Sequence, residues 1–290
     1  MKIVGICPVR NEDWCLGLTL RAALQWCDEV IVLDHASTDR TETILSEIDD
    51  ETEHKRLFWF IEPDPLWREM THRQRLLTCA RSRNATHIAM IDADELLTAN
   101  LIPHIRTWIE RLGPMQMLCL PWICVAHMKQ GDYTTYMSSG MWAKQRVSTA
   151  FKDAPQLHWT TANGYDFHHR APYGCTWHDV PMSSGGGLLH LQFLSKRRLF
   201  AKQYLYQLTE RLRWPDREPV AQMSEKYSLT VREALAAQTA ACHANWFAGY
   251  EDLLQYLQVD AEPWQEAECR RLLKEHPGIG EGCNSFGLSL

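Results

Sequence analysis

The sequence lacks the signals of several large classes of protein. No apolar run is long enough to cross a bilayer, so we expect no stable membrane span. No internal repeat and no low-complexity linker is present, which argues against repeat proteins and loosely tethered domains. The formal net charge is −6 and the pI is near 6.1, and this acidic balance argues against broad electrostatic capture of nucleic acid.

The cysteine pattern excludes two further classes. Ten cysteines are scattered without a CxxC pair, so neither a disulfide framework nor a structural zinc site is expected. The polar run Arg10–Asp13 follows the first apolar stretch too soon for a secretory signal. We therefore expect a cytoplasmic protein with reduced thiols. Its 290 residues, of which 45% are hydrophobic, can bury a substantial core.

Strands and helices alternate through the first hundred residues. The predicted elements, in chain order, are strand Lys2–Cys7, helix Trp14–Cys27, strand Glu29–Leu33, helix Arg40–Ile48 with its cap at Ser37 or Thr38, strand Arg56–Ile61, helix Trp67–Arg83 and strand His87–Ile91. Such alternation indicates an α/β protein whose mixed, mostly parallel central sheet is flanked by helices.

The pattern loosens after Leu112. The elements predicted there are strands Met115–Val125 and Met141–Phe151 and helices Ser195–Trp214, Val231–Phe247, Gly249–Leu257 and Trp264–Glu275. The stretch Asp153–Gly187 is irregular. We expect an elaborated helical C-terminal region that is contiguous with the α/β half, with a division near residue 113.

Three polar clusters follow predicted strand ends, at residues 8–13, 34–41 and 92–95. In open parallel sheets, ligands bind beyond the carboxyl ends of the strands. We therefore expect the three clusters to lie together on one edge.

The third cluster, Asp92-Ala93-Asp94-Glu95, follows the apolar run Ile88–Ile91 directly. Alternate side chains of an extended backbone point the same way, so Asp92 and Asp94 can address one hard cation. Mg²⁺ held in this manner keeps coordination sites for water and substrate phosphates. The alternative is a strand followed by a helix whose first turn places Asp94 and Glu95 near its dipole.

Taken in order, four features resemble family-2-type glycosyltransferases of the GT-A fold, over the chain up to about Glu110. They are PVRNE at Pro8–Glu12, DHASTDRT at Asp34–Thr41, a helix with Arg75, and DADE at Asp92–Glu95. The resemblance implies an inverting, hexosyltransferase-like enzyme that uses Mn²⁺ or Mg²⁺. It also implies a nucleoside diphosphate sugar as donor, with a UDP-sugar as the expected one, and an acceptor hydroxyl that the sequence does not identify.

The same resemblance implies roles for individual residues. The nucleotide loop would be lined by Pro8, Val9, Arg10 and Glu12, and the base would contact Asp34. The donor phosphates would contact Arg75, and the metal would bind Asp92 and Asp94. The donor would bind residues 1–113 and the acceptor residues 114–290. From the residues alone, the alternative for Asp34 is a turn-forming residue, and the alternative for Arg75 is an exposed helix arginine.

A second, weaker resemblance lies at Leu188–Lys202, where LLHLQFLSKRRLFAK looks like the strand, histidine and basic helix that close the donor site in some members. It implies His190 as a metal ligand, and Ser195, Arg198 and Lys202 as phosphate contacts on one helix face. The alternative is an ordinary amphipathic helix preceded by a core histidine.

An inverting transfer also needs a carboxylate that accepts the acceptor's proton. Asp166 and Asp179 are the candidates, with Asp153 ranked after them, and for each of them taken alone a structural role is favoured over a catalytic one. Two other functions stay open. A nucleotidyltransferase should have a Gly-rich basic loop where this chain has PVRNE, and a non-catalytic nucleotide- or glycan-binding module would need no base.

Overall fold

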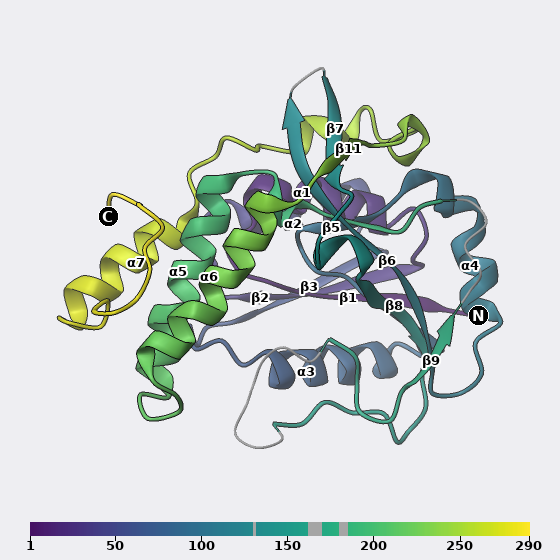
Figure 1. Cartoon of the computed structure of the whole chain (residues 1–290). Helices are drawn as coiled ribbons and strands as arrows, with labels where there is room; N and C mark the ends of the chain where they lie inside the picture. Colours follow the sequence, from purple (N-terminus) through teal and green to yellow (C-terminus); the bar gives the residue numbers. More distant parts are fainter. Residues whose placement is uncertain (130–131, 162–169, 180–184) are drawn as a thin grey trace. The chain divides into compact units, whose positions relative to one another are not determined.

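Figure 1 shows the computed structural model, which describes residues 1–129, 132–161, 170–179 and 185–290. The chain divides into two compact units. The first comprises Met1–Trp122, Gln145–His190 and His243–Gln258, and the second comprises Ile123–Lys144, Leu191–Cys242 and Val259–Leu290. The functional division of donor and acceptor binding at residue 113 stays a prediction.

The first unit is built on a mixed sheet. Its strands are β1 (Ile3–Val9), β2 (Glu29–His35), β3 (Leu57–Glu62), β4 (His87–Met90), the beginning of β6 (Gln116–Lys129), β8 (Arg146–Lys152) and β9 (Thr176–Asp179), with the short pair β5 (Glu95–Leu97) and β10 (Leu188–His190). The order β3-β2-β1-β4 is parallel throughout. Strand β8 pairs antiparallel with β4 and with β6, and β9 pairs parallel with β6. The predicted α/β fold with a mixed sheet is confirmed, and its N-terminal strands form the parallel part.

Helices cover both faces of this sheet (Figure 1). They are α1 (Asp13–Ala23), α2 (Thr41–Glu51) and α4 (Ile102–Glu110) on one face, and α3 (Glu69–Ser82) on the other. Because successive strand side chains point to opposite faces, β1 sends Cys7 and Val9 into the core beneath α1 and α2. Val4 and Ile6 of the same strand pack into the core beneath α3. The parallel strands are therefore apolar on both faces.

The second unit is mainly helical. Its elements include α5 (Lys196–Arg213), α6 (Val220–Ala236), α7 (Trp264–Glu275), the end of β6, and the strands β7 (Asp132–Met137) and β11 (Thr239–Ala241). Helix α5 packs against α6 and α7, and β7 pairs antiparallel with β11. The predicted helical C-terminal region is confirmed. None of the helices in the described part of the chain has both the length and the apolar character needed to cross a membrane.

Two predicted helices of the C-terminal region are wrong. The helix expected at Val231–Phe247 is α6, which ends at Ala236. Residues 239–241 instead form β11, because pairing with β7 overrides their local preference. The helix expected at Gly249–Leu257 is only a 3₁₀ turn at Leu253–Tyr256.

Candidate active site

The carboxyl ends of β2, β1 and β4 lie side by side, because these strands are parallel neighbours. Val9, the last residue of β1, is in register with Asp34 of β2. The amide of Ile91, just beyond β4, donates to the carbonyl of Ile6 at 3.0 Å. The three polar clusters therefore leave the sheet on the same edge.

Hydrogen bonds join the first two clusters into one loop assembly. The amide of Asn11 donates to Ser37 Oγ at 2.9 Å, and the amide of Thr38 donates to Asn11 Oδ1 at 2.6 Å. Asn11 has a φ of 53°, a left-handed conformation that asparagine adopts more readily than most residues. The amide of Asp13 donates to Asp39 Oδ2 at 3.0 Å. Each loop therefore fixes the conformation of the other.

The carboxylate of Asp34 shapes this assembly from within. Asp34 is 2% exposed, and its Oδ1 accepts the amide of Ser37 at 3.1 Å. This is the turn-forming arrangement that the residues alone allowed, and contact with a base stays a prediction. The predicted cap at Ser37 or Thr38 is wrong, because α2 begins at Thr41, whose amide donates to Asp39 Oδ1 at 2.9 Å.

The other residues assigned to the nucleotide loop are built into its frame. Pro8 is buried within β1. Nη1 of Arg10 donates to the carbonyl of Pro65 at 2.6 Å. The Glu12 carboxylate accepts the indole N–H of Trp14, and the Glu12 backbone carbonyl accepts the amides of Cys15 and Leu16 in the first turn of α1. Their contact with a nucleotide stays a prediction.

His35, which follows Asp34 in the chain, packs against two other rings, the buried His72 and the partly buried Trp67, and the three rings form one wall of the loop assembly. The ring centroid of His35 lies 5.1 Å from that of Trp67 and 4.7 Å from that of His72. Burial lowers the pKa of His35 and the pKa of His72 to about 4. Both imidazoles are therefore neutral at pH 7, and the wall adds no charge to the loop assembly.

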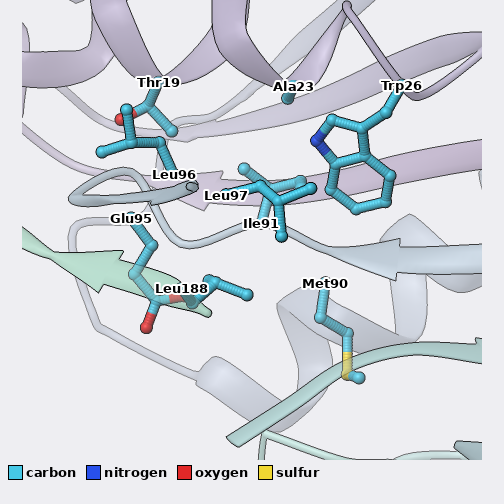
Figure 2. A pocket seen from close by; sticks show the side chains of 9 residues that line it. All are labelled: Thr19, Ala23, Trp26, Met90, Ile91, Glu95, Leu96, Leu97 and Leu188. Carbon is cyan, nitrogen blue, oxygen red and sulfur yellow. The ribbon is translucent and has the colours of Figure 1, made fainter. Parts of the chain in front are cut away.

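Helix α1 anchors the turn that contains the carboxylates. The carbonyl of Ala93 accepts the Thr19 hydroxyl at 2.8 Å and the Cys15 thiol at 3.1 Å. The chain then enters β5 at Glu95, so the alternative of a helix starting here is wrong. Figure 2 shows the small pocket beside this turn, where the Glu95 carboxylate points away from Thr19 and Trp26.

Two arginines hold the carboxylate of Asp92. Nη2 of Arg73, on α3, donates to Asp92 Oδ1 at 2.9 Å, and Nη1 of Arg170 donates to Oδ2. Burial alone would raise the pKa of Asp92, but Arg170 and Arg73 hold it below its ordinary value. Nε of Arg73 also donates to Glu69 Oε1 at 2.8 Å. Both oxygens of Asp92 are therefore engaged by protein cations, and its metal role stays a prediction.

Asp94 and His190, two of the three predicted metal ligands, lie in contact. Asp94 Oδ2 and His190 Nε2 are 3.4 Å apart, and their side chains are 12% and 5% exposed. Strand pairing produces this contact, because His190 at the end of β10 is in register with Glu95 of β5.

Glu95 and Trp122 complete the surroundings of this pair. The Glu95 side chain is 1% exposed, and its Oε2 lies 2.6 Å from Nη2 of Arg170. Its Oε1 accepts the indole N–H of Trp122 at 2.8 Å. The indole also stacks on the His190 ring, with centroids 4.3 Å apart and planes inclined by 16°.

The chemistry of Asp94 and His190 fits a divalent cation. A carboxylate suits Mg²⁺ and Mn²⁺, and a neutral imidazole binds many divalent metals. Ligand atoms lie about 2.0–2.1 Å from Mg²⁺, so one ion can bind two atoms that are 3.4 Å apart. In the described ranges, no three His, Cys, Asp or Glu side chains form a complete cage. An ion here would leave sites for water and a diphosphate.

Three other predicted site residues belong to the second unit. Ser195 is the N-cap of α5, where its Oγ accepts the amide of Arg198 at 3.3 Å, and this confirms the predicted helix start. The Arg198 side chain is buried and donates to the carbonyl of Ala261 at 2.9 Å. Lys202 is half-buried on the same helix. Their roles toward a phosphate stay predictions.

The remaining predicted residues are Arg75 and the acids proposed as bases. Arg75 forms an ion pair with Glu62 and lies over the ring of Phe60, on the half-exposed side of α3. Asp166 lies outside the described residues, and Asp179 is the last residue of β9. The third candidate, Asp153, is held by Arg81 through contacts of 2.9 and 2.8 Å. The base assignment therefore stays a prediction.

The sequence reasoning missed Arg73, Arg170 and Trp122. A signal existed for Arg73, because it shares the buried face of α3 with Leu76, Leu77 and Ala80 at helical spacing. An arginine in an apolar stripe needs a buried partner. Arg170 gave no such signal, since it lies in the stretch 153–187, where the sequence predicts no helix or strand, and it reaches Asp92 across 78 residues.

Comparison with known proteins gives distant structural matches. No family model matches the chain, and neither does any curated protein. The mannosyltransferase PcManGT from Pyrobaculum calidifontis, in complex with GDP-Man and Mn²⁺, matches 100% of this chain and 76% of its own at 16% identity, with a TM-score of 0.43. Residues 1–349 of TarS from S. aureus match 97% of this chain and 90% of their own at 13% identity, with a TM-score of 0.40.

A third structure matches only part of the chain. Glucosyl-3-phosphoglycerate synthase from Mycobacterium tuberculosis, in complex with Mg²⁺ and UDP, matches 33% of this chain and 34% of its own at 20% identity, with a TM-score of 0.25. At these identities and TM-scores the likeness is distant, so the function proposed below rests on the chain's own side chains.

Proposed function

We propose that this protein is a metal-dependent glycosyltransferase that moves a sugar from a nucleoside diphosphate sugar to an acceptor hydroxyl. A UDP-sugar is the expected donor, and the anomeric carbon is inverted. One observation carries the proposal, which is the contact of Asp94 with His190 at 3.4 Å. Its place on the carboxyl edge of the parallel strands supports it, because ligands of such sheets bind there.

Asp94 and His190 would hold Mn²⁺ or Mg²⁺ in this proposal. A bound divalent ion supplies positive charge that stabilises the departing diphosphate. The charged side chains around Asp94 and His190 determine the balance of charge at the site before an ion binds. The carboxyl groups of Glu69, Asp92, Asp94 and Glu95 face the two guanidinium groups of Arg73 and Arg170, so acidic groups outnumber cationic ones before an ion binds. A divalent ion would offset this excess and add positive charge where a diphosphate binds.

The other residues divide between binding and proton transfer. The loop assembly of residues 10–13 and 34–41 would hold the nucleoside. In the transfer, the acceptor oxygen forms a bond to the anomeric carbon while the bond to the diphosphate breaks, and the diphosphate leaves with its electron pair. A carboxylate takes the acceptor proton, and Asp166 and Asp179 remain the candidates for that role.

The test compares site variants with an acid at the opposite edge of the sheet. We expect Asp94→Asn and His190→Gln to lower donor hydrolysis and transfer by at least about 100-fold, the loss typical of removing one group that stabilises developing charge. Asp28, which is paired with Arg106 at 3.0 Å, supplies the control Asp28→Asn. Nucleoside diphosphate release measures all three. Full activity of Asp94→Asn, or of the unaltered protein in excess chelator, would defeat the metal role.

A thermal-shift screen identifies the donor. Nucleoside diphosphates and their sugars are added with and without Mn²⁺ or Mg²⁺, since a ligand of the native state raises the apparent melting temperature. We expect the largest shift with a UDP-sugar and metal together. Tight donor binding without turnover on a broad panel of acceptors would instead indicate a non-catalytic module, and selective binding of triphosphates would indicate a nucleotidyltransferase.

A further inference from the structure

Trp122 contacts two residues at the centre of the candidate site. It lies near the middle of β6, where it packs against the core cluster that contains Leu118 and Leu120. The backbone amide of Trp122 donates to the carbonyl of Gln145 at 2.9 Å. Its indole ring stacks on His190 and donates to Glu95. The backbone of Trp122 and the core cluster therefore hold the residue in place, while one face of its ring stacks on His190 and its N–H edge meets Glu95.

The stacking matters because a histidine ring is not fixed by its own rotamer. The terminal torsion of histidine has a broad energy profile, so Nε2 can leave Asp94 by a simple rotation. The indole ring opposes that rotation, because its centroid lies 4.3 Å from that of the imidazole and the two planes are inclined by only 16°, so the imidazole would have to turn into the indole. The imidazole is thereby kept in the plane that directs Nε2 to Asp94 Oδ2.

The indole is itself oriented by a buried carboxyl group. Its N–H donates to Oε1 of Glu95 at 2.8 Å, and the other oxygen of Glu95 lies 2.6 Å from Arg170. Glu95 also stands opposite His190 in the strand pair. The indole therefore links the two members of a cross-strand pair, one through its edge and one through its face.

We propose that Trp122 is a positioning residue for the metal-binding histidine: its ring sets the plane of His190, and its N–H, held by Glu95, sets the plane of the indole. This inference rests on the proposed function, since it assumes that Asp94 and His190 bind a divalent ion. Groups that orient a metal ligand typically change metal affinity about 10- to 100-fold when they are replaced.

The structure offers a matched control. Trp108 of α4 is also partly buried, packs against the same core cluster and stacks on a histidine, His104, with centroids 6.1 Å apart. The variants are therefore Trp122→Leu, which removes both contacts, Trp122→Phe, which keeps an aromatic face but loses the N–H, and Trp108→Leu. Thermal unfolding first establishes that each is folded.

The main measurement is Mn²⁺ binding, followed by the electron paramagnetic resonance signal of free Mn²⁺ in titrations with excess UDP and, in parallel, GDP. Trp122→Leu should weaken Mn²⁺ binding about 10- to 100-fold, Trp122→Phe by a smaller factor, and Trp108→Leu not at all. Equal affinity of the unaltered protein and Trp122→Leu would overturn the inference and leave the proposed function standing. Absence of Mn²⁺ binding by the unaltered protein would overturn the metal part of that function, and this inference with it.

A second measurement needs no metal and no activity. Stacking on an indole shifts the imidazole C–H resonances of His190 upfield in proton spectra, and His190→Gln assigns those signals by their loss. We expect the upfield shift to be lost in Trp122→Leu and retained in Trp108→Leu. If Trp122→Leu does not fold, Trp122→Phe carries the test through its weaker Mn²⁺ binding and its reduced shift. Unchanged shifts and unchanged affinity in Trp122→Phe would then count against the proposal.

Discussion

The two edges of the parallel sheet both pair carboxylates with cationic side chains, but they differ in burial. At the amino edge, Glu29 lies 2.6 Å from Lys2 and 2.5 Å from Arg83, and both cationic side chains are about one-third exposed. At the carboxyl edge, the Arg73 and Arg170 side chains are 4% and 13% exposed, and they share Asp92.

This difference in burial indicates that the ion pairs at the two edges have different roles. An exposed pair contributes roughly 0–1 kcal/mol to stability and is screened by salt. A buried network gains little net stability over an apolar one, because desolvation offsets its attraction, yet removing one partner is costly. The amino-edge pairs join the ends of strands and helices. We attribute the carboxyl-edge network instead to the geometry that it imposes on Asp92 and Glu95.

The largest effect that we expect comes from breaking the buried network. Arg170→Met should lower the free energy of unfolding by about 3–5 kcal/mol, because Glu95 and Asp92 lose a shared cation inside the protein. Arg83→Met at the amino edge should cost no more than about 1 kcal/mol. Urea unfolding of both variants measures the difference. Similar losses of unfolding free energy in Arg170→Met and Arg83→Met would show that burial does not distinguish the two edges.

A smaller effect per residue should follow from acid. Burial lowers the pKa of His35 and His72 at the carboxyl edge, and of His87 at the start of β4, to about 4, from an ordinary value of 6.5. The unfolded chain therefore binds more protons between these values, so stability is complete above about pH 6.5 and falls as the pH drops toward 4. Each histidine contributes at most about 3 kcal/mol.

Variants of these histidines also show whether burial or a position at the carboxyl edge causes the loss of stability in acid. His35→Gln and His87→Gln should each flatten the pH dependence of urea unfolding, because both remove a buried neutral imidazole. His54→Gln is the control, since His54 is exposed and Asp49 raises its pKa. A slope that only His35→Gln reduces would assign the effect to the carboxyl edge and not to burial.

The smallest effect concerns one hydroxyl at each edge. Thr19→Val removes the buried donor to the Ala93 carbonyl and should cost about 1–2 kcal/mol. Thr86, whose hydroxyl contacts the backbone of Lys2 at the amino edge, is exposed, so Thr86→Val should cost less than about 1 kcal/mol. Thr19→Ser should restore nearly all of the loss. If Thr19→Ser is as unstable as Thr19→Val, packing of the methyl group and not the hydrogen bond would explain the result.

Local patterns predicted much of the fold. The range expected for α7, Trp264–Glu275, matches the structure, because apolar periodicity and the preceding Pro263 define that helix locally. The pairing of β7 with β11 was missed, since nothing near either strand signals it. There, the amide of Ser138 meets the carbonyl of Gln238 across 100 residues at 2.8 Å.

The candidate site, too, could be predicted only in part from local sequence patterns. The acidic turn and His190 could be found because each follows an apolar strand in a recognisable order. The arginine chosen on α3 was Arg75, whereas Arg73 reaches Asp92, because two positions along a helix turn a side chain to a different face. The arginines that neutralise the acidic turn are brought there by packing between residues far apart in the sequence. The local sequence pattern does not reveal such packing.

The position of β1 between β2 and β4 has a consequence for synthesis. The hydrogen bond from the amide of Lys2 to Thr86 closes a loop of 84 residues, and β4 follows directly after that loop. At about 5–20 residues per second, a ribosome needs several seconds to make that length. During this time the wholly buried strand Ile3–Val9 lacks a neighbour on one side. The emerging chain thus exposes an apolar edge, and its yield should depend on chaperones or on fast elongation through α3.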